Sequence, residues 1–179
     1  SGVGAGEFNV SRLDIASDLQ GLSIDVLLAK MRVRNIRTDS MSLYKGTIYM
    51  GSNPKIRIYD KVKEIKGHHK YDGVTEYERE LLDSGKSCTR FEVQIRNVRK
   101  TLQDVVDDPL RFGSYFDRLE FFKLQGNNDS GVLQVLYKHM NRKFRNELEV
   151  YRDRELEALL KERYVEGVMY WFNEVKEPF

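Results

Sequence analysis

A tyrosine stands between two cations in a stretch of alternating character, residues 56–62. Side chains of a β-strand alternate between its two faces, so Arg57, Tyr59 and Lys61 would share one face and the apolar residues the other. A tyrosine hydroxyl, with a pKa of about 10 in solution, is a weak nucleophile at neutral pH, and nearby cations stabilise its phenolate. The pattern therefore admits a nucleophilic tyrosine. It also admits, as the commoner case, a half-buried tyrosine that only packs against its neighbours.

Carboxylates lie on the polar faces of two other predicted strands. In residues 9–19, Asp14 and Asp18 share the face opposite the leucines and the isoleucine. At roughly 3.3 Å per residue they stand about 13 Å apart, too far to bind one metal ion from a straight strand. In residues 88–96, Glu92 shares the polar face with arginines and a glutamine. At most one of the two aspartates is thus a candidate metal ligand, and the alternative that both lie on a solvated strand face stays open.

The elements that would position these residues follow from local patterns. Two alternating runs, residues 47–50 and 56–62, flank a Gly-Ser-Asn-Pro cluster, which is typical of a β-hairpin. Three segments are expected between the strands: a short amphipathic helix over 23–34 with Ser23 as its N-cap, a loop over 63–73, and a helix over 74–82. After residue 97 the pattern becomes helical, with an interruption at Pro109, an aromatic set in 115–124, a loop at 126–131 and helices over 132–172.

These elements predict an α+β fold. We expect an antiparallel-rich central sheet with helices packed on one face, followed by a helical C-terminal region. We interpret residues 1–8, which are small and glycine-rich, as an expression scar. Residues 9–125 are predicted to form the core domain, and residues 126–179 a helical extension packed on that core.

Composition excludes several classes of protein. The chain has 179 residues and a net charge of +2, a balance that neither demands nor excludes nucleic acid. A single cysteine, Cys88, allows no intramolecular disulfide and no cysteine-rich zinc site, which suits the cytoplasm. No run approaches the roughly 18 apolar residues of a membrane span, so we expect no membrane partner. We interpret the adjacent His68 and His69 as loop residues, because no third ligand stands at a familiar zinc spacing.

Four motifs, taken together, resemble a known family. They are RLDIASD, TIYMGS, IRIYDKVKE and RFEVQIR, in this order over residues 11–96. The succession is similar to the replication initiation factor family, the Rep_trans-type initiators of rolling-circle plasmids, phages and integrative conjugative elements. The resemblance implies an enzyme that nicks and rejoins origin DNA through a tyrosine nucleophile, leaving a 5′-phosphotyrosine link and a free 3′-hydroxyl.

The resemblance also implies roles for individual residues. Tyr59 matches the tyrosine of the family pattern and is the expected nucleophile, with Tyr49 in reserve. Arg57 and Lys61 would stabilise the phenolate. A Mg²⁺ or Mn²⁺ ion, which prefers hard oxygen ligands, would polarise the scissile phosphate. The expected metal ligands are Asp14, Glu92 and Glu64.

Partners follow from the same resemblance. We expect origin DNA, single-stranded or cruciform, and further expect a helicase and a second copy of the chain as partners. Phosphate contacts are expected from Arg12, Lys30, Arg32, Arg34, Arg90 and Arg96. Two alternatives stay open: a non-catalytic binding module on the same fold, and a metal-dependent nuclease that activates water instead of tyrosine.

Overall fold

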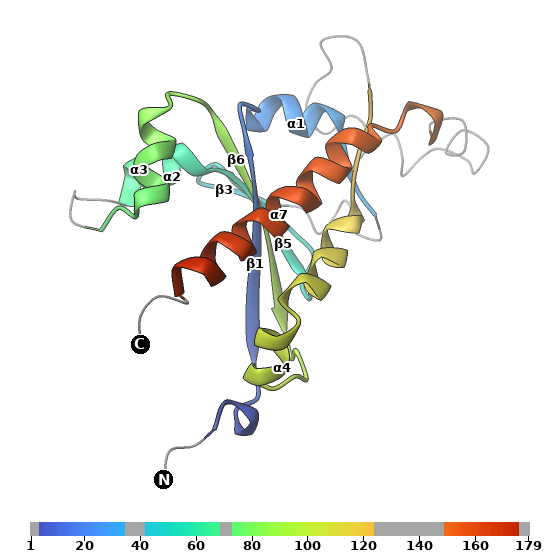
Figure 1. Cartoon of the computed structure of the whole chain (residues 1–179). Helices are drawn as coiled ribbons and strands as arrows, with labels where there is room; N and C mark the ends of the chain where they lie inside the picture. Colours follow the sequence, from blue (N-terminus) through green and yellow to red (C-terminus); the bar gives the residue numbers. More distant parts are fainter. Residues whose placement is uncertain (1–3, 35–41, 69–72, 124–148, 176–179) are drawn as a thin grey trace.

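The centre of the protein is an antiparallel sheet with the strand order β1-β6-β5-β4-β3 (Figure 1). The structure is a computed structural model that describes residues 4–34, 42–68, 73–123 and 149–175. The strands are β1 (Arg12–Gln20), β3 (Ser42–Tyr44), β4 (Thr47–Met50), β5 (Lys55–Asp60) and β6 (Cys88–Arg96). The predicted loop at 126–131 and the first part of the predicted C-terminal helices lie outside the described residues.

Helices and a second, two-stranded sheet surround the central sheet. The α-helices are α1 (Ile24–Lys30), α2 (Lys61–His68), α3 (Glu76–Asp83), α4 (Leu102–Asp107) and α7 (Arg154–Val175). Three 3₁₀ helices are η1 (Ala5–Glu7), η3 (Pro109–Arg118) and η4 (Glu149–Tyr151), and the second sheet pairs β2 (Met31–Val33) with β7 (Leu119–Phe121). The predicted α+β class, with an antiparallel central sheet and a C-terminal helix, is confirmed.

Strict alternation along β6 separates the two faces of the sheet. Phe91 and Val93 are fully buried on the apolar face, together with Ile56 and Ile58 of the neighbouring β5. Strand β1 pairs with β6 along all nine of its residues, with Ile15 opposite Val93. The predicted strands at both positions are confirmed, and the same register places the charged residues of β1, β6 and β5 together on the other face.

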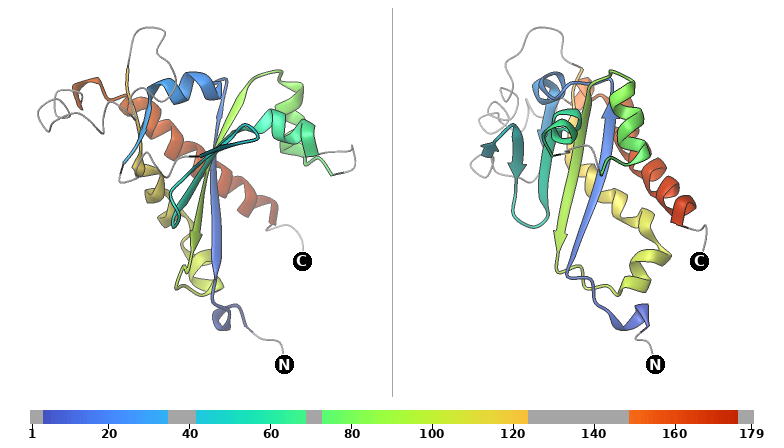
Figure 2. Two further views of the ribbon diagram at one scale, coloured as in Figure 1. Left: turned by 180° about the vertical axis from the view of Figure 1, so that it is seen from behind. Right: turned by 90° about the vertical axis from the view of Figure 1, so that its left-hand side faces the viewer.

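Helices contact both faces. In Figure 1 the sheet is seen close to edge-on, with α2 and α3 on one side and α1 and η3 on the other. The two views of Figure 2 show the same arrangement from behind and from the side. Helix α7 packs against β1 and η3. The Ser17 hydroxyl, buried in β1, donates to the Leu160 carbonyl of α7 at 2.6 Å. This bond satisfies a polar group in the apolar layer and fixes α7 against the sheet.

The predicted hairpin is confirmed, but its second strand is shorter than expected. Strands β4 and β5 pair antiparallel, and β5 ends at Asp60, where α2 begins with Lys61. The Asp60 carboxylate accepts a hydrogen bond from the Lys63 amide at 3.0 Å, which is N-cap geometry. The prediction that Lys61 continues the strand was therefore wrong, and so was the predicted loop for residues 63–68, because this cap starts a helix.

A second boundary also differs from the prediction. Ser23 caps α1 as expected, since its hydroxyl accepts from the Val26 amide. The helix ends at Lys30, however, and residues 31–33 form β2, which pairs with β7. The predicted helix over 23–34 was too long because the partner strand lies almost ninety residues further along the chain and leaves no local signal. The helix predicted at 74–82 is confirmed as α3, with a capping box from Thr75 and Glu78.

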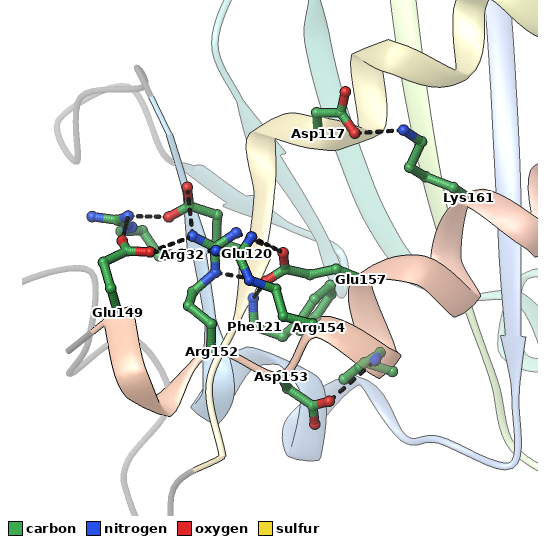
Figure 3. Close-up of polar contacts among 11 residues, drawn as sticks. Arg32, Asp117, Glu120, Phe121, Glu149, Arg152, Asp153, Arg154, Glu157 and Lys161 are labelled. Carbon is green, nitrogen blue, oxygen red and sulfur yellow. Dashed lines mark hydrogen bonds and ion pairs between the residues drawn. The ribbon is translucent and has the colours of Figure 1, made fainter.

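Buried ion pairs join the second sheet to the start of α7 (Figure 3). Glu120 of β7 is 3 % exposed and pairs with Arg32 of β2 and with Arg152, which precedes α7. Arg152 in turn donates to Glu157 of α7 at 2.5 Å and to Glu149 of η4 at 2.9 Å. Each charge in this cluster has a partner of opposite sign, which offsets the cost of removing it from water. No helix within the described ranges is long and apolar enough to cross a membrane.

Burial of Tyr164 should make the free energy of unfolding fall at alkaline pH. Its hydroxyl donates to the Pro109 carbonyl at 2.6 Å, and burial, followed by the charge of Asp108, raises its pKa to about 12. The unfolded tyrosine ionises near pH 10, so the stability contributed by Tyr164 is complete below that pH and is lost as the pH rises from 10 towards 12. Urea unfolding measures the fall in the free energy of unfolding from pH 8 to pH 11. This fall should be about 1 kcal/mol smaller in Tyr164→Phe than in the unsubstituted protein. Equal losses in both proteins would contradict this assignment.

Candidate active site

The polar face of the sheet gathers the residues on which chemistry could depend. Four strands contribute to it, and all its members follow from the alternation described above. The face carries Arg12, Asp14 and Asp18 from β1, Arg90, Glu92, Gln94 and Arg96 from β6, Lys55, Arg57 and Tyr59 from β5, and Tyr49 from β4.

Tyr59, Glu92 and Arg57 form a hydrogen-bonded group at the centre of this face. The Tyr59 hydroxyl donates to Glu92 Oε2 at 3.1 Å, and Arg57 Nη1 donates to Glu92 Oε1 at 2.7 Å. Arg57 lies directly opposite Glu92 in the β5–β6 register, so the backbone sets this pairing. The Arg57 guanidinium also lies over the Tyr59 ring, with its central carbon 5.5 Å from the ring centre. A hydroxyl, a carboxylate that accepts its hydrogen bond and a guanidinium that orients the carboxylate are thus in hydrogen-bond contact.

Burial raises the pKa of Tyr59, and the charge of Glu92 raises it further. The side chain is 7 % exposed. Arg90, opposite Tyr59 in the register, acts in the other direction but does not cancel these effects. Burial and Glu92 thus act against the phenolate that the flanking cations and a metal ion were expected to stabilise, and that expectation stays a prediction. Burial and Glu92 favour the neutral hydroxyl of Tyr59, which donates a hydrogen bond to Glu92.

Lys61 does not flank Tyr59 as the sequence predicted. Its side chain is 5 % exposed, and Nζ lies 2.6 Å from Glu64 and 3.2 Å from Glu78. The lysine belongs to the first turn of α2, so its direction follows the helix and not the strand. Lys61 thus joins α2 to α3 through Glu78, and its predicted contribution to a phenolate has no geometric support.

Asp18 is held in a network that the sequence analysis missed. Both carboxylate oxygens accept from Arg90, from Nε and Nη2, each at 2.7 Å. The Tyr77 hydroxyl of α3 donates to Oδ2 at 2.5 Å. This contact fastens α3 to the polar face, and burial together with the charge of Asp18 raises the pKa of Tyr77. Tyr77 lies almost sixty residues from Asp18 in the sequence, so no local pattern indicates the contact.

Asp14, in contrast, is partly open to solvent. It accepts from Arg12 Nε at 2.9 Å, and the side chains of Asp14 and Arg12 are 33 % and 52 % exposed. Its register partner is Gln94, two residues along β6 from Glu92. Residues related in this diagonal way lie roughly 7–8 Å apart, within reach of side chains of this length. Asp14 and Glu92 can therefore approach one cation from neighbouring strands.

The donor chemistry of these two carboxylates suits a hard cation. Mg²⁺ is commonly held by one or two carboxylates, with substrate phosphates and water completing its coordination. The described ranges contain no group of three or more histidine, cysteine, aspartate or glutamate side chains that could hold a metal ion. Glu64, the third predicted ligand, bonds to Lys61 in α2. The described residues thus fit an ion shared between two carboxylates and a substrate, and the role of Glu64 stays a prediction.

A cavity of about 820 Å³ opens beside Tyr59. It is bounded by residues of β3, β4, β5, α1 and α2, among them Tyr49, Arg57, Glu64 and His68. His68, which the sequence analysis assigned to a loop, ends α2 and lines this cavity. Tyr49, the reserve nucleophile, lies opposite Arg57 with no carboxylate as its hydrogen-bond partner among the contacts of the described residues.

The residues predicted to contact DNA phosphates divide into two groups. Arg12, Arg90 and Arg96 lie on the polar face of the central sheet. Of these, Arg90 is held by Asp18, whereas Arg96 is exposed at the end of β6. Lys30, Arg32 and Arg34 lie at the end of α1 and along β2, where Arg32 pairs with Glu120. The first group lies on the central sheet and the second on or beside β2, and their predicted role in DNA contact stays a prediction.

Fold and site together define an α+β protein whose sheet presents a tyrosine–carboxylate pair on its polar face. Residues 2–117 match the family model described as replication-associated protein G2P, N-terminal. The match covers more than half of the chain, and the chain belongs to this family of rolling-circle replication initiators. The resemblance to rolling-circle initiators noted in the sequence is thereby confirmed. A search of curated proteins and a search of solved structures found no match.

The two aspartates of β1 should differ in their effect on stability. Asp18→Asn removes a charge that pairs with a mostly buried arginine, and we expect it to lower the free energy of unfolding by about 2 kcal/mol. Asp14→Asn, at a more exposed pair, is the matched control and should change it by about 0.5 kcal/mol or less. Urea unfolding at pH 7 measures both. An effect of Asp14→Asn as large as that of Asp18→Asn would show that the network around Asp18 has no special structural role.

Proposed function

We propose that this protein nicks and rejoins single-stranded origin DNA by a tyrosine transesterification. The observation that carries the proposal is the hydrogen-bonded group in which the Tyr59 hydroxyl donates to Glu92 while Arg57 orients the carboxylate. A nucleophile within hydrogen-bond reach of a base, which a third group orients, is the arrangement that activates hydroxyl nucleophiles in enzymes. Membership in a family of replication initiators supports DNA as the substrate.

The reaction can be written with these residues. Tyr59 Oη attacks the phosphorus of a phosphodiester, and Glu92 accepts the proton of the hydroxyl. The bond between phosphorus and the 3′-oxygen breaks, and the 3′-oxygen takes up one proton from water to leave as a 3′-hydroxyl, while Glu92 returns the proton of Tyr59 to the solvent. The 5′-side of the DNA stays bound to Tyr59 as a phosphotyrosine diester. The reverse reaction, attack by a 3′-hydroxyl, rejoins the strand without an external energy source because the diester bond is conserved.

Arg57 is placed to stabilise the negative charge that develops on the phosphate. Its side chain is 31 % exposed, so a phosphate in the cavity can approach the guanidinium. Its Nη1 bonds to Glu92, and its Nε is buried without a hydrogen-bond partner within the described parts of the chain. Donors aimed at the position where charge develops are among the strongest contributions to catalysis. Arg57 would thus serve both the base and the substrate.

A divalent ion would be held by Asp14 and Glu92, the two carboxylates of the polar face that can approach one another. When bound, Mg²⁺ or Mn²⁺ supplies Lewis-acid polarisation of the phosphate oxygens. In the structure Asp14 pairs with Arg12, so binding of the ion would compete with Arg12 for the Asp14 oxygens and would release Arg12 to contact a DNA phosphate. The bond from Arg57 to Glu92 Oε1 would remain, and with it the orientation of the base.

Replacement of the two candidate tyrosines tests the proposed nucleophile. Tyr59→Phe should abolish the covalent protein–DNA adduct, because no oxygen remains to attack, while single-stranded DNA binding persists. Tyr49→Phe is the matched control and should still form the adduct. The readout is a denaturing gel of protein incubated with a pool of labelled single-stranded DNA in Mn²⁺ or in EDTA.

Two outcomes of this experiment would contradict the proposal. An adduct that survives Tyr59→Phe and disappears in Tyr49→Phe would move the nucleophile to Tyr49. DNA that is cut without an adduct would identify water as the nucleophile, and DNA that is bound but never cut across a broad pool would identify a binding module.

Calorimetric titration with Mn²⁺ tests the proposed ligands. Asp14→Asn and Glu92→Gln should each weaken Mn²⁺ binding by about tenfold or more, since each removes one of two charged ligands. Asp117→Asn, an exposed carboxylate of η3 paired with Lys161, should leave the affinity unchanged. The same titration of Glu64→Gln reports whether Glu64 contributes. Unchanged affinity in both Asp14→Asn and Glu92→Gln would refute the two-carboxylate site.

A further inference from the structure

The hairpin formed by β3 and β4 takes no part in the chemistry proposed above, yet it stands beside the site. Its strands are joined by Lys45 and Gly46, whose φ angles are 48° and 80°. Two consecutive residues with positive φ make the tight hairpin turn whose twist matches that of the flanking strands. The short turn fixes the register of β3 on β4, so the side chains on each face of the hairpin have set positions.

Two tyrosines lie on the same face of this hairpin, each with a cation over its ring. Tyr44 is opposite Thr47, and Tyr49 is opposite Ser42, so the tyrosines are diagonal neighbours, roughly 7–8 Å apart. Tyr44 is 61 % exposed, and Lys45 Nζ lies 5.3 Å from its ring centre. Lys55 Nζ lies 5.0 Å from the ring centre of Tyr49, which also has the Arg57 guanidinium 5.7 Å away.

The tyrosines continue directly into the candidate active site. Tyr49 is the register partner of Arg57, which bonds to Glu92 and lies over Tyr59. Tyr44, Tyr49 and Tyr59 all line the same cavity. A path therefore runs along one face of the sheet from the exposed edge of the hairpin to the Tyr59 hydroxyl.

The positive charge of this path indicates an anionic ligand. Residues 42–57 contain three cations, Lys45, Lys55 and Arg57, and no aspartate or glutamate. Aromatic rings interleaved with cations, in a segment without carboxylates, complement a polyanion that carries flat apolar rings. Single-stranded DNA has this chemistry, because its bases can stack on side chains while its phosphates meet lysine and arginine. Duplex DNA has the same charge, but its bases are already stacked on each other.

We infer that the β3–β4 hairpin, together with Lys55 and Arg57 of the adjacent β5, is a binding track for single-stranded DNA, with bases stacked on Tyr44 and Tyr49 and phosphates held by Lys45, Lys55 and Arg57. The inference rests on the proposed function, since the track leads the strand to Tyr59. Stacking is tolerant of sequence because every base has a π-face. The track therefore supplies affinity for a single strand and positions it, while recognition of a particular origin depends on other contacts.

Binding to a short oligothymidylate tests the track without knowledge of the origin sequence. With a probe of about 12 nucleotides, followed by fluorescence anisotropy, Tyr44→Ala should weaken binding by about tenfold. Tyr44→Phe retains the ring and should stay within about twofold of the unsubstituted protein. Tyr151→Ala removes another exposed tyrosine, 53 % exposed in η4, and should leave binding unchanged. A duplex of the same length should bind more weakly and should be insensitive to Tyr44→Ala.

Photocrosslinking adds a direct readout. An oligonucleotide carrying 5-iodouracil should crosslink to Tyr44 or Tyr49, as located by peptide mass mapping. Unchanged oligothymidylate binding in both Tyr44→Ala and Tyr49→Ala would overturn the inference, and so would a Tyr44→Phe defect as large as that of Tyr44→Ala. Normal binding by these variants together with an adduct at Tyr59 would refute the track and leave the proposed function standing. Weakened binding by the Tyr44→Ala and Tyr49→Ala variants, together with no adduct on the unsubstituted protein, would support the track and refute the nicking activity.

Discussion

Charge pairing across the polar face of β1, β6 and β5 is the constraint on which the site depends. The side chains of Glu92 and Asp18 are only 12 % and 13 % exposed, and a carboxylate removed from water is costly unless a cation and hydrogen-bond donors accompany it. The strand register supplies those cations, since Arg57 is the register partner of Glu92 and Arg90 that of Asp18. A one-residue slip of any of these strands would move the charges into the apolar layer beneath α7 and η3. The same pairing that excludes such a slip also holds Glu92 in position for Tyr59.

The two partly buried carboxylates, Asp18 and Glu92, therefore have different roles. Asp18 is saturated by Arg90 and Tyr77, and it connects the sheet to α3, whose first turn also reaches Lys61 of α2 through Glu78. Glu92 instead accepts from a tyrosine hydroxyl that lines an open cavity. Asp18 thus stabilises the frame, and Glu92 holds the hydroxyl that we propose as the nucleophile. This division places the proposed nucleophile next to the β3–β4 hairpin, along which we infer that a DNA strand binds.

Much of this arrangement could be predicted from the sequence, because β-strand alternation is a local signal. The apolar positions of β1 and β6 gave the correct faces, and with them the correct side for Asp14, Glu92 and Tyr59. The start of α2 was not predicted because the alternating pattern of β5 continues through Val62. Asp60, which caps the helix, is itself a residue type that favours a helix start. Strand β2 and the Tyr77–Asp18 contact depend on partners far along the chain, which no local pattern indicates. The raised pKa of Tyr59 follows from burial, which spacing alone does not reveal.

In the proposed reaction the hydroxyl oxygen of Tyr59 forms the new bond to phosphorus. The most direct measurement is peptide mass mapping of the unsubstituted protein after incubation with a single-stranded DNA pool and Mn²⁺, followed by nuclease digestion of the attached strand. We predict a nucleotide joined through its 5′-phosphate to Tyr59, and no such adduct when EDTA replaces the metal. A nucleotide on Tyr49 or on any other residue, or one joined through its 3′-phosphate, would contradict it.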